Sequence, residues 1–254
     1  MRTRLVAGNW KMHGSLPENA TLLRAVRDGV ADLQTSRVAV CVSFPYLYQA
    51  QQALAGSRVA WGAQTVSQHA KGAFTGEVSA AMLREFGCTY VIVGHSERRT
   101  LFAEDDATVA AKFAAAVGAG LTPILCMGET QQQRDAGVTQ TTVLTQLTAV
   151  IDHCGIGALG QAALAYEPLW AIGTGRTATP EQAQEVHAFL RTCIASRDAV
   201  LAQEVPILYG GSVKAANARD LFAMPDIDGG LVGGAALVGE EFVAICRSAD
   251  RLTG

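Results

Sequence analysis

The sequence has little charge and no excess of one sign. Charged residues make up 17% of its 254 positions, and the formal net charge is −3 at pH 7. Proteins that bind nucleic acid usually carry a run or patch of Lys and Arg, and no such run is present. No apolar stretch approaches the roughly 20 residues that a membrane-spanning helix needs. We therefore expect neither a nucleic-acid partner nor a membrane partner.

Paired cysteine motifs are also missing. No two cysteines form the CxxC pair that is typical of zinc and redox sites, although their even number would allow three disulfides. Cys41 and Cys126 lie in apolar, strand-like runs, which favours buried free thiols in a reducing cytosol. The N-terminal segment turns polar too early for a signal peptide. Both observations predict a cytoplasmic protein. The six cysteines are Cys41, Cys88, Cys126, Cys154, Cys193 and Cys246.

What the sequence does contain is an alternation of short apolar runs and longer segments of helical periodicity. Such an alternation predicts a parallel α/β sheet, and about 250 residues is the usual size of a single (β/α)8 barrel. No linker divides the chain, so we expect one domain over residues 1–254. An open doubly wound sheet is the alternative, but the turn Gly8-Asn9-Trp10-Lys11 lacks its GxGxxG pattern. The predicted strands are 4–9, 37–44, 58–65, 88–94, 121–127, 161–167, 205–210 and 228–234.

Two of the predicted helices carry clear start signals. Thr179 is a suitable N-cap, Pro180 suits the first helical position, and Gln182 can close a capping box. A second helix begins near residues 104–106, where acidic side chains suit the positive end of the helix dipole. Its apolar face includes Phe113.

Polar residues follow the first predicted strand. In a parallel barrel, the residues at the carboxyl ends of the strands meet at one mouth. Leu5 and Ala7 suit the barrel interior, and side chains two apart in a strand share a face. Asn9 and Lys11 should therefore project into the mouth. For Lys11 the alternative is a solvated position on the rim.

His95 follows the fourth predicted strand. Val91 and Val93 precede it at the same alternation, which predicts that His95 also points into the mouth. Residues 96–99 look like the start of a short helix, and a helix N-terminus disfavours a protonated imidazole beside it. A neutral imidazole can donate a hydrogen bond to a carbonyl oxygen. The alternative is a structural histidine whose hydrogen bonds are satisfied within the fold.

Glu167 ends the sixth predicted strand, after Ala163 and Ala165 on the same face. A carboxylate in apolar surroundings loses solvation, which raises its affinity for a proton and suits a general base. The alternative is a salt-bridged structural glutamate. Residues 168–178 follow with apolar residues and glycines, which suits a lid that excludes water from the mouth. An ordinary packed connection is the alternative for that loop.

Glycine pairs end the last two predicted strands, at Gly210-Gly211-Ser212 and Gly233-Gly234. Glycine lets backbone N–H groups approach a ligand closely, and donors after strands seven and eight often bind phosphate in barrels. The mouth would then hold a base, a hydrogen-bond donor, a cation and an anion site. It lacks a metal-ligand cluster, a GxSxG elbow and a Walker loop, so we expect no metal and no cofactor. These residues favour proton abstraction beside the carbonyl of a phosphorylated sugar fragment.

Five motifs stand in a fixed order along the chain. They are Gly8-Asn9-Trp10-Lys11, Gly94-His95-Ser96-Glu97-Arg98-Arg99, Ala165-Tyr166-Glu167-Pro168-Leu169-Trp170-Ala171-Ile172-Gly173-Thr174-Gly175, Tyr209-Gly210-Gly211-Ser212-Val213 and Gly233-Gly234. Together they resemble the triosephosphate isomerase family. The resemblance covers about residues 4–245, and the segment around Glu167 is its most specific part. It implies a TIM barrel that interconverts dihydroxyacetone phosphate and glyceraldehyde 3-phosphate in glycolysis and gluconeogenesis.

The resemblance implies a role for each site residue. Glu167 would shuttle a proton between adjacent substrate carbons, and neutral His95 would polarise the carbonyl. Lys11 would supply positive charge, with Glu97 as its partner, and Asn9 would hydrogen-bond the substrate oxygens. Backbone N–H groups would bind the phosphate at Gly173, Ser212, Gly233 and Gly234.

The glycine-rich loop 72–79 resembles the loop through which members of this family interdigitate as homodimers. It implies that Thr75 reaches the site of a second copy near Asn9 and Glu97. Two other interpretations remain open from the sequence. One is a different phosphate-binding barrel enzyme, such as an aldolase, which would need a buried lysine where Glu167 stands. The other is a non-catalytic barrel binding protein, which would be expected to have lost the base or the lid.

Overall fold

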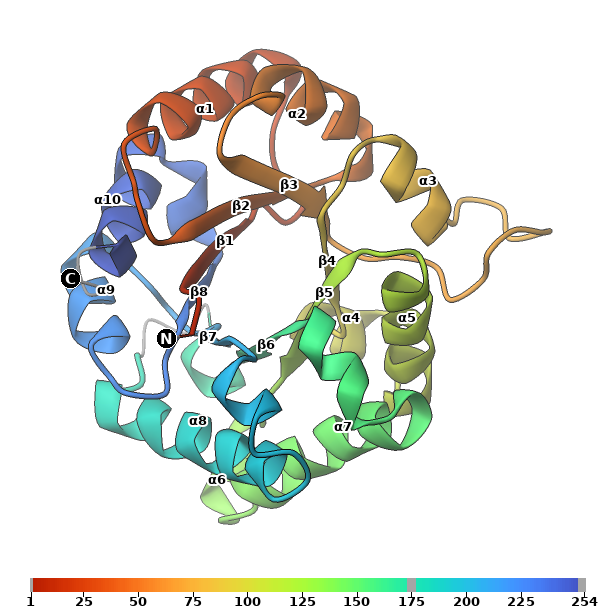
Figure 1. Cartoon of the computed structure of the whole chain (residues 1–254), viewed down its shortest axis with the longest axis vertical. Coiled ribbons are helices and arrows are strands. Elements are labelled where there is room, and N and C mark those ends of the chain that lie inside the picture. Colours follow the sequence, from red (N-terminus) through yellow and green to blue (C-terminus); the bar gives the residue numbers. More distant parts are fainter. Residues whose placement is uncertain (1, 173–176, 251–254) are drawn as a thin grey trace.

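The protein folds as a closed barrel of parallel strands surrounded by helices (Figure 1). The computed structural model describes residues 2–172 and 177–250. In that part of the chain, eight strands pair in sequential order, and β1 closes the barrel against β8. This is the (β/α)8 TIM barrel that the alternating pattern predicts. The strands are β1 Leu5–Asn9, β2 Arg37–Val42, β3 Val59–Ala63, β4 Tyr90–Val93, β5 Thr122–Met127, β6 Ala163–Tyr166, β7 Ile207–Tyr209 and β8 Gly229–Val232.

Helices cover the outside of the barrel and follow the strands in turn (Figure 1). None of the helices formed by the described residues is long and apolar enough to cross a membrane. The α-helices are α1 Leu16–Gly29, α2 Leu47–Leu54, α3 Ala80–Glu85, α4 Ser96–Leu101, α5 Asp106–Gly118, α6 Gln131–Asp135, α7 Thr139–Cys154, α8 Pro180–Ala195, α9 Ala215–Phe222 and α10 Gly239–Asp250. Short 3-10 helices are η1 Phe44–Tyr46, η2 Ile156–Gln161, η3 Leu169–Ala171, η4 Leu201–Gln203 and η5 Gly234–Leu237.

Both helix-start predictions are confirmed. The Thr179 hydroxyl accepts the Gln182 N–H, and the Gln182 side chain accepts the Thr179 N–H, so the capping box opens α8 at Pro180. The other predicted helix is α5, which begins at Asp106 with Asp105 as its N-cap. Local hydrogen bonds of this kind depend on neighbouring residues alone, which is why sequence locates them well.

The core has two layers, one inside the barrel and one between barrel and helices. Alternation works as expected in β1 and β6, where Leu5, Ala7, Ala163 and Ala165 point inward. The barrel interior is formed by Leu5, Ala7, Ala39, Cys41, Tyr90, Ile92, Ile124, Cys126, Ala163, Ala165, Leu208 and Leu231.

The alternation predicted for the fourth strand is wrong. Tyr90 and Ile92 face the interior, whereas Val91 and Val93 pack outward against the helices. Gly94 then adopts a left-handed φ of 70°, which breaks the alternation at the end of β4. His95 reaches the barrel mouth because of that turn, and not because it shares a face with the two valines.

Candidate active site

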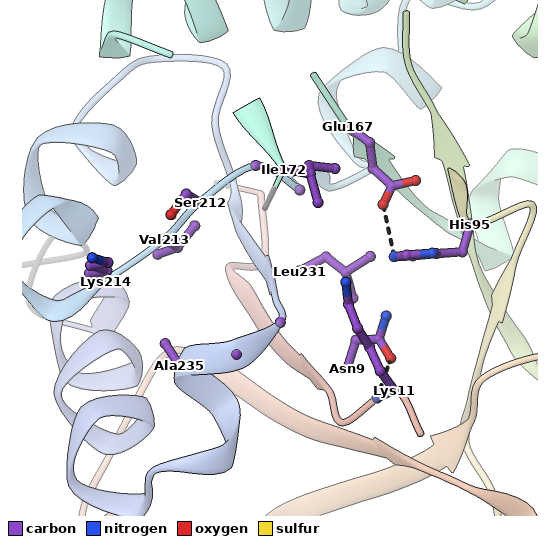
Figure 2. A pocket seen from close by; sticks show the side chains of 14 residues that line it. Asn9, Lys11, His95, Glu167, Ile172, Ser212, Val213, Lys214, Leu231 and Ala235 are labelled. Carbon is purple, nitrogen blue, oxygen red and sulfur yellow. Dashed lines mark hydrogen bonds and ion pairs between the residues drawn. The ribbon is translucent and has the colours of Figure 1, made fainter. Parts of the chain in front are cut away.

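A cavity of about 380 Å³ opens at the carboxyl ends of the strands (Figure 2). It brings together Asn9, Lys11, His95 and Glu167 from β1, β4 and β6, as the sequence predicts. Glu97 is not part of the cavity wall, and Gly173 lies outside the described residues. The wall consists of Asn9, Lys11, His95, Glu167, Ile172, Gly210, Gly211, Ser212, Val213, Lys214, Leu231, Gly233, Gly234 and Ala235.

Glu167 is the most deeply buried acid of this cavity, with 2% of its surface exposed. Its Oε2 accepts the backbone N–H of Ser96 at 2.9 Å, and its Oε1 accepts the Ser96 hydroxyl at 3.3 Å. Oε1 also lies 2.9 Å from Nε2 of His95 (Figure 2). Sequence reasoning missed the part that Ser96 plays, because strand alternation does not show which backbone N–H faces the carboxylate.

His95 serves as the N-cap of α4. Its Nδ1 accepts the backbone N–H of Glu97 at 3.2 Å, so the proton of the neutral ring resides on Nε2. Burial lowers the pKa of His95, but the carboxylates of Glu167 and Glu97 outweigh it and the net direction is upward. The start of α4 therefore contributes one hydrogen bond to Nδ1 of His95, as expected. The direction of the net pKa shift of His95, however, is set by the two carboxylates.

Lys11 adopts a left-handed backbone conformation, with φ at 52°. Non-glycine residues rarely adopt this region, and its strain persists only where neighbours hold it. The Lys11 N–H donates to Oδ1 of Asn9 at 3.0 Å, and the Lys11 carbonyl accepts from Ser43 and Gln64 at 2.9 and 2.8 Å. The ammonium group lies 2.6 Å from Oε1 of Glu97. These contacts fix a cation beside His95 and Asn9.

The opposite side of the cavity is built mostly from backbone. Ser212, Val213, Lys214 and Ala235 lie across the cavity from His95 (Figure 2). Gly233 and Gly234 open η5, where the first N–H groups of a helical turn have no partner within it. This half offers hydrogen-bond donors and one exposed lysine, which suits a bound anion. Sequence reasoning did not predict that Lys214, Ile172 and Leu231 would line this cavity.

The cavity thus pairs a buried carboxylate with an imidazole N–H and a fixed ammonium group, across from a wall rich in backbone N–H groups. Among residues 2–172 and 177–250, no group of three His, Cys, Asp or Glu side chains is arranged to hold a metal ion. These features define a (β/α)8-barrel enzyme of acid–base chemistry that acts on a small anionic substrate.

Comparison with known proteins gives the family. The sequence model of the triosephosphate isomerase family matches residues 4–249. The chain is 65% identical to the triosephosphate isomerase of Thiobacillus denitrificans over 251 residues, which cover 99% of the chain and 100% of that protein. It is 60% identical to the triosephosphate isomerase of Nitrosomonas europaea over 249 residues, with 98% and 99% coverage. The chain belongs to the triosephosphate isomerase family, and its reaction is the isomerisation of triose phosphates.

Proposed function

We propose that the chain interconverts dihydroxyacetone phosphate and glyceraldehyde 3-phosphate through an enediolate, with Glu167 as the base. The observation that carries this proposal is the buried pair of Glu167 and His95, 2.9 Å apart at the wall of the cavity. A carboxylate and an imidazole N–H at this spacing can reach a carbon and the oxygen bonded next to it in one small substrate.

In the proposed reaction, Glu167 removes a proton from the carbon beside the substrate carbonyl and returns it to the neighbouring carbon. The electron pair of the broken C–H bond forms a C=C bond and the carbonyl pair moves onto oxygen, so an enediolate forms between the two steps. The hydroxyl proton of the first carbon then passes to that oxygen, and the first carbon becomes the new carbonyl when Glu167 returns its proton to the second carbon. Nε2–H of His95 donates to that oxygen and stabilises its developing charge. Lys11 adds positive charge, Asn9 donates a hydrogen bond, and Glu97 holds the ammonium group in place.

The phosphate is proposed to lie against the glycine-rich wall. Backbone N–H groups of Ser212, Gly233 and Gly234 are the candidate donors there. The family resemblance adds Gly173 of the loop 168–178, which lies outside the described residues. That loop is proposed to close over the substrate, because an enediolate that carries a phosphate group eliminates phosphate when water reaches it.

The test is a coupled assay of glyceraldehyde 3-phosphate isomerisation with wild-type protein and Glu167→Gln. We expect kcat to fall about 10³-fold or more, because the amide cannot accept the proton, while KM changes little. Circular dichroism of the variant provides the folding control. A kcat near the wild-type value in a folded Glu167→Gln variant would show that Glu167 is not the base.

We also propose that the chain works as a homodimer. The loop between β3 and α3 projects from the body of the barrel (Figure 1), and Phe74 and Thr75 at its tip are exposed. A groove of about 310 Å³ beside the active site carries exposed Met12 and Phe102, and also Glu97. Burial of apolar side chains favours association, so the loop of one copy is proposed to fill the groove of the other.

Two further expectations are kept as proposals. The core between barrel and helices runs through side chains from Val6 to Ala249, which supports one domain for the chain. All six cysteines are free thiols, and Cys41, Cys88, Cys126 and Cys246 are buried. Free thiols suit a reducing compartment, which supports a cytoplasmic location.

A further inference from the structure

A glutamine that is not part of the wall of the active-site cavity holds the backbone behind Glu167. Gln146 lies on α7, outside the barrel. Its Oε1 accepts the N–H of Gly128 at 2.9 Å, and its Nε2 donates to the carbonyl of Gly128 at 3.2 Å. One side-chain amide therefore pairs with both the donor and the acceptor of a single buried residue, as a neighbouring strand would.

Gly128 lies directly against the base. A Cβ at this position would collide with the backbone carbonyl of Glu167, so the two chain segments approach as closely as glycine allows. The residues on either side of Gly128 also bind the segment that begins with Glu167. The carbonyl of Met127 accepts the N–H of Glu167 at 2.7 Å, and the carbonyl of Glu129 accepts the N–H of Leu169 at 3.1 Å. The position of residues 127–129 thus sets the position of the base and of the loop that follows it.

Packing alone does not fix this segment. Gly128 and Gln146 line a cavity of about 340 Å³, together with Glu167 and Leu169. Side chains next to such a space have neighbours on one side only, so the segment has room to shift. The two hydrogen bonds from Gln146 therefore oppose a shift of Gly128 away from α7.

We propose that Gln146 is a positioning residue for the isomerase reaction, which acts through Gly128 on the backbone that carries Glu167. This inference rests on the proposed role of Glu167 as the base. Gln146 itself touches no reacting atom. Its effect is to keep the carboxylate at the distance from which proton transfer is fast, because a misplacement of about 1 Å can cost roughly 10²-fold in rate.

The test uses Gln146→Leu, which keeps the shape of the side chain and removes both hydrogen bonds. We expect kcat to fall about 10-fold with KM within about twofold of wild type, because the base moves and the phosphate wall does not. We also expect a larger primary deuterium isotope effect on kcat, with substrate deuterated at the carbon that loses the proton. Proton transfer then limits the rate more than it does in the wild type. Gln140→Leu, at an exposed position of the same helix, is the matched control and should change neither quantity.

The isotope effect separates positioning from a loss of stability. A variant that merely folds less well has fewer active molecules, so its kcat falls with an unchanged isotope effect, and that result would overturn the proposal. Gln146→Glu is the second variant, for use if Gln146→Leu does not fold. Its carboxylate still accepts from Gly128 N–H but cannot donate to the carbonyl and repels it, so we expect kcat and the isotope effect to change in the same directions as in Gln146→Leu. A Gln146→Glu variant with the kcat and the isotope effect of the wild type would also overturn the proposal.

The two proposals fail differently. If Glu167→Gln is inactive while the folded Gln146 variants match wild type in kcat and isotope effect, only the positioning role is wrong. If Glu167→Gln keeps its activity, the assignment of the base is wrong, and the positioning role falls with it.

Discussion

At the scale of single residues, the space around Glu167 depends on neighbouring glycines, because a larger side chain at their positions would meet the glutamate. A Cβ at Gly210 would lie 2.9 Å from Cγ of Glu167, and one at Gly128 would meet its backbone carbonyl. Gly94 takes a φ of 70°, which turns the chain so that His95 enters the mouth. Each glycine thus serves the site through a close approach or a backbone angle that a larger residue would prevent.

Gly234 differs from these glycines, because a Cβ there meets no atom within 4 Å. Gly234→Val should therefore fold normally and place its methyl groups at the proposed phosphate wall. We expect KM to rise about 10-fold or more, because the phosphate loses its close approach to the backbone. Steady-state kinetics with glyceraldehyde 3-phosphate measures this directly.

The control for that measurement is Gly157→Val. Gly157 also has open space around its Cβ position, and it lies in η2, away from the cavity wall. The control should leave KM unchanged. If Gly234→Val and Gly157→Val share the wild-type KM, the phosphate does not bind at Gly234.

At the scale of elements, α8 docks on the barrel through a buried histidine. His187 is fully buried, and its Nδ1 lies 3.2 Å from the carbonyl of Asp226. Its ring lies between those of Tyr166 and Tyr209, at 5.9 and 6.5 Å. Burial lowers the pKa of His187 to about 4, with a further lowering by the guanidinium of Arg191.

This shift predicts that acid lowers the free energy of unfolding. The unfolded state protonates near pH 6.5 and the folded state only near pH 4, so the unfolded chain binds more protons between these values. The free energy of unfolding should fall by about 2–3 kcal/mol from this group between pH 7 and pH 4.5. Urea unfolding at a fixed protein concentration measures it, and His187→Gln, which cannot be protonated, should lose that part of the pH dependence. An equal pH dependence in variant and wild type would contradict the assignment.

At the scale of the whole molecule, the proposed dimer joins the groove of one copy to the loop of another. Met12 is 93% exposed in the single chain, although it stands next to Lys11. Met12→Glu places a charge in the apolar groove, which costs free energy on burial. We expect the wild type to sediment as a dimer and Met12→Glu to sediment as a monomer. We also expect a lower kcat for Met12→Glu.

Val200→Glu is the matched control for that prediction. Val200 is 70% exposed, comparably to the groove residues, but it does not line the groove. This variant should sediment as the wild type does. A wild type that sediments as a single chain would show that the association proposal is wrong, whatever the variants do.

Sequence by itself determined the order of the elements and the choice of the groups that are proposed to react. The capping box from Thr179 to Gln182 and the apolar alternation of β1 and β6 depend on near neighbours, so their patterns can be seen in one dimension. Every predicted strand contains the observed one, with ends that extend further by up to two residues. The motif around Glu167 further indicated the family, which the comparisons show.

Tertiary structure decided how those groups are held. Only folding brings Ser96 to Glu167, places Gln146 behind Gly128 and gathers donors that follow β2 and β3 around the carbonyl of Lys11. The pKa of His95 likewise depends on two carboxylates that reach it across the barrel mouth and from α4. Hydrogen bonds and electrostatic interactions act through space at a few ångströms, whereas a sequence pattern records only separation along the chain.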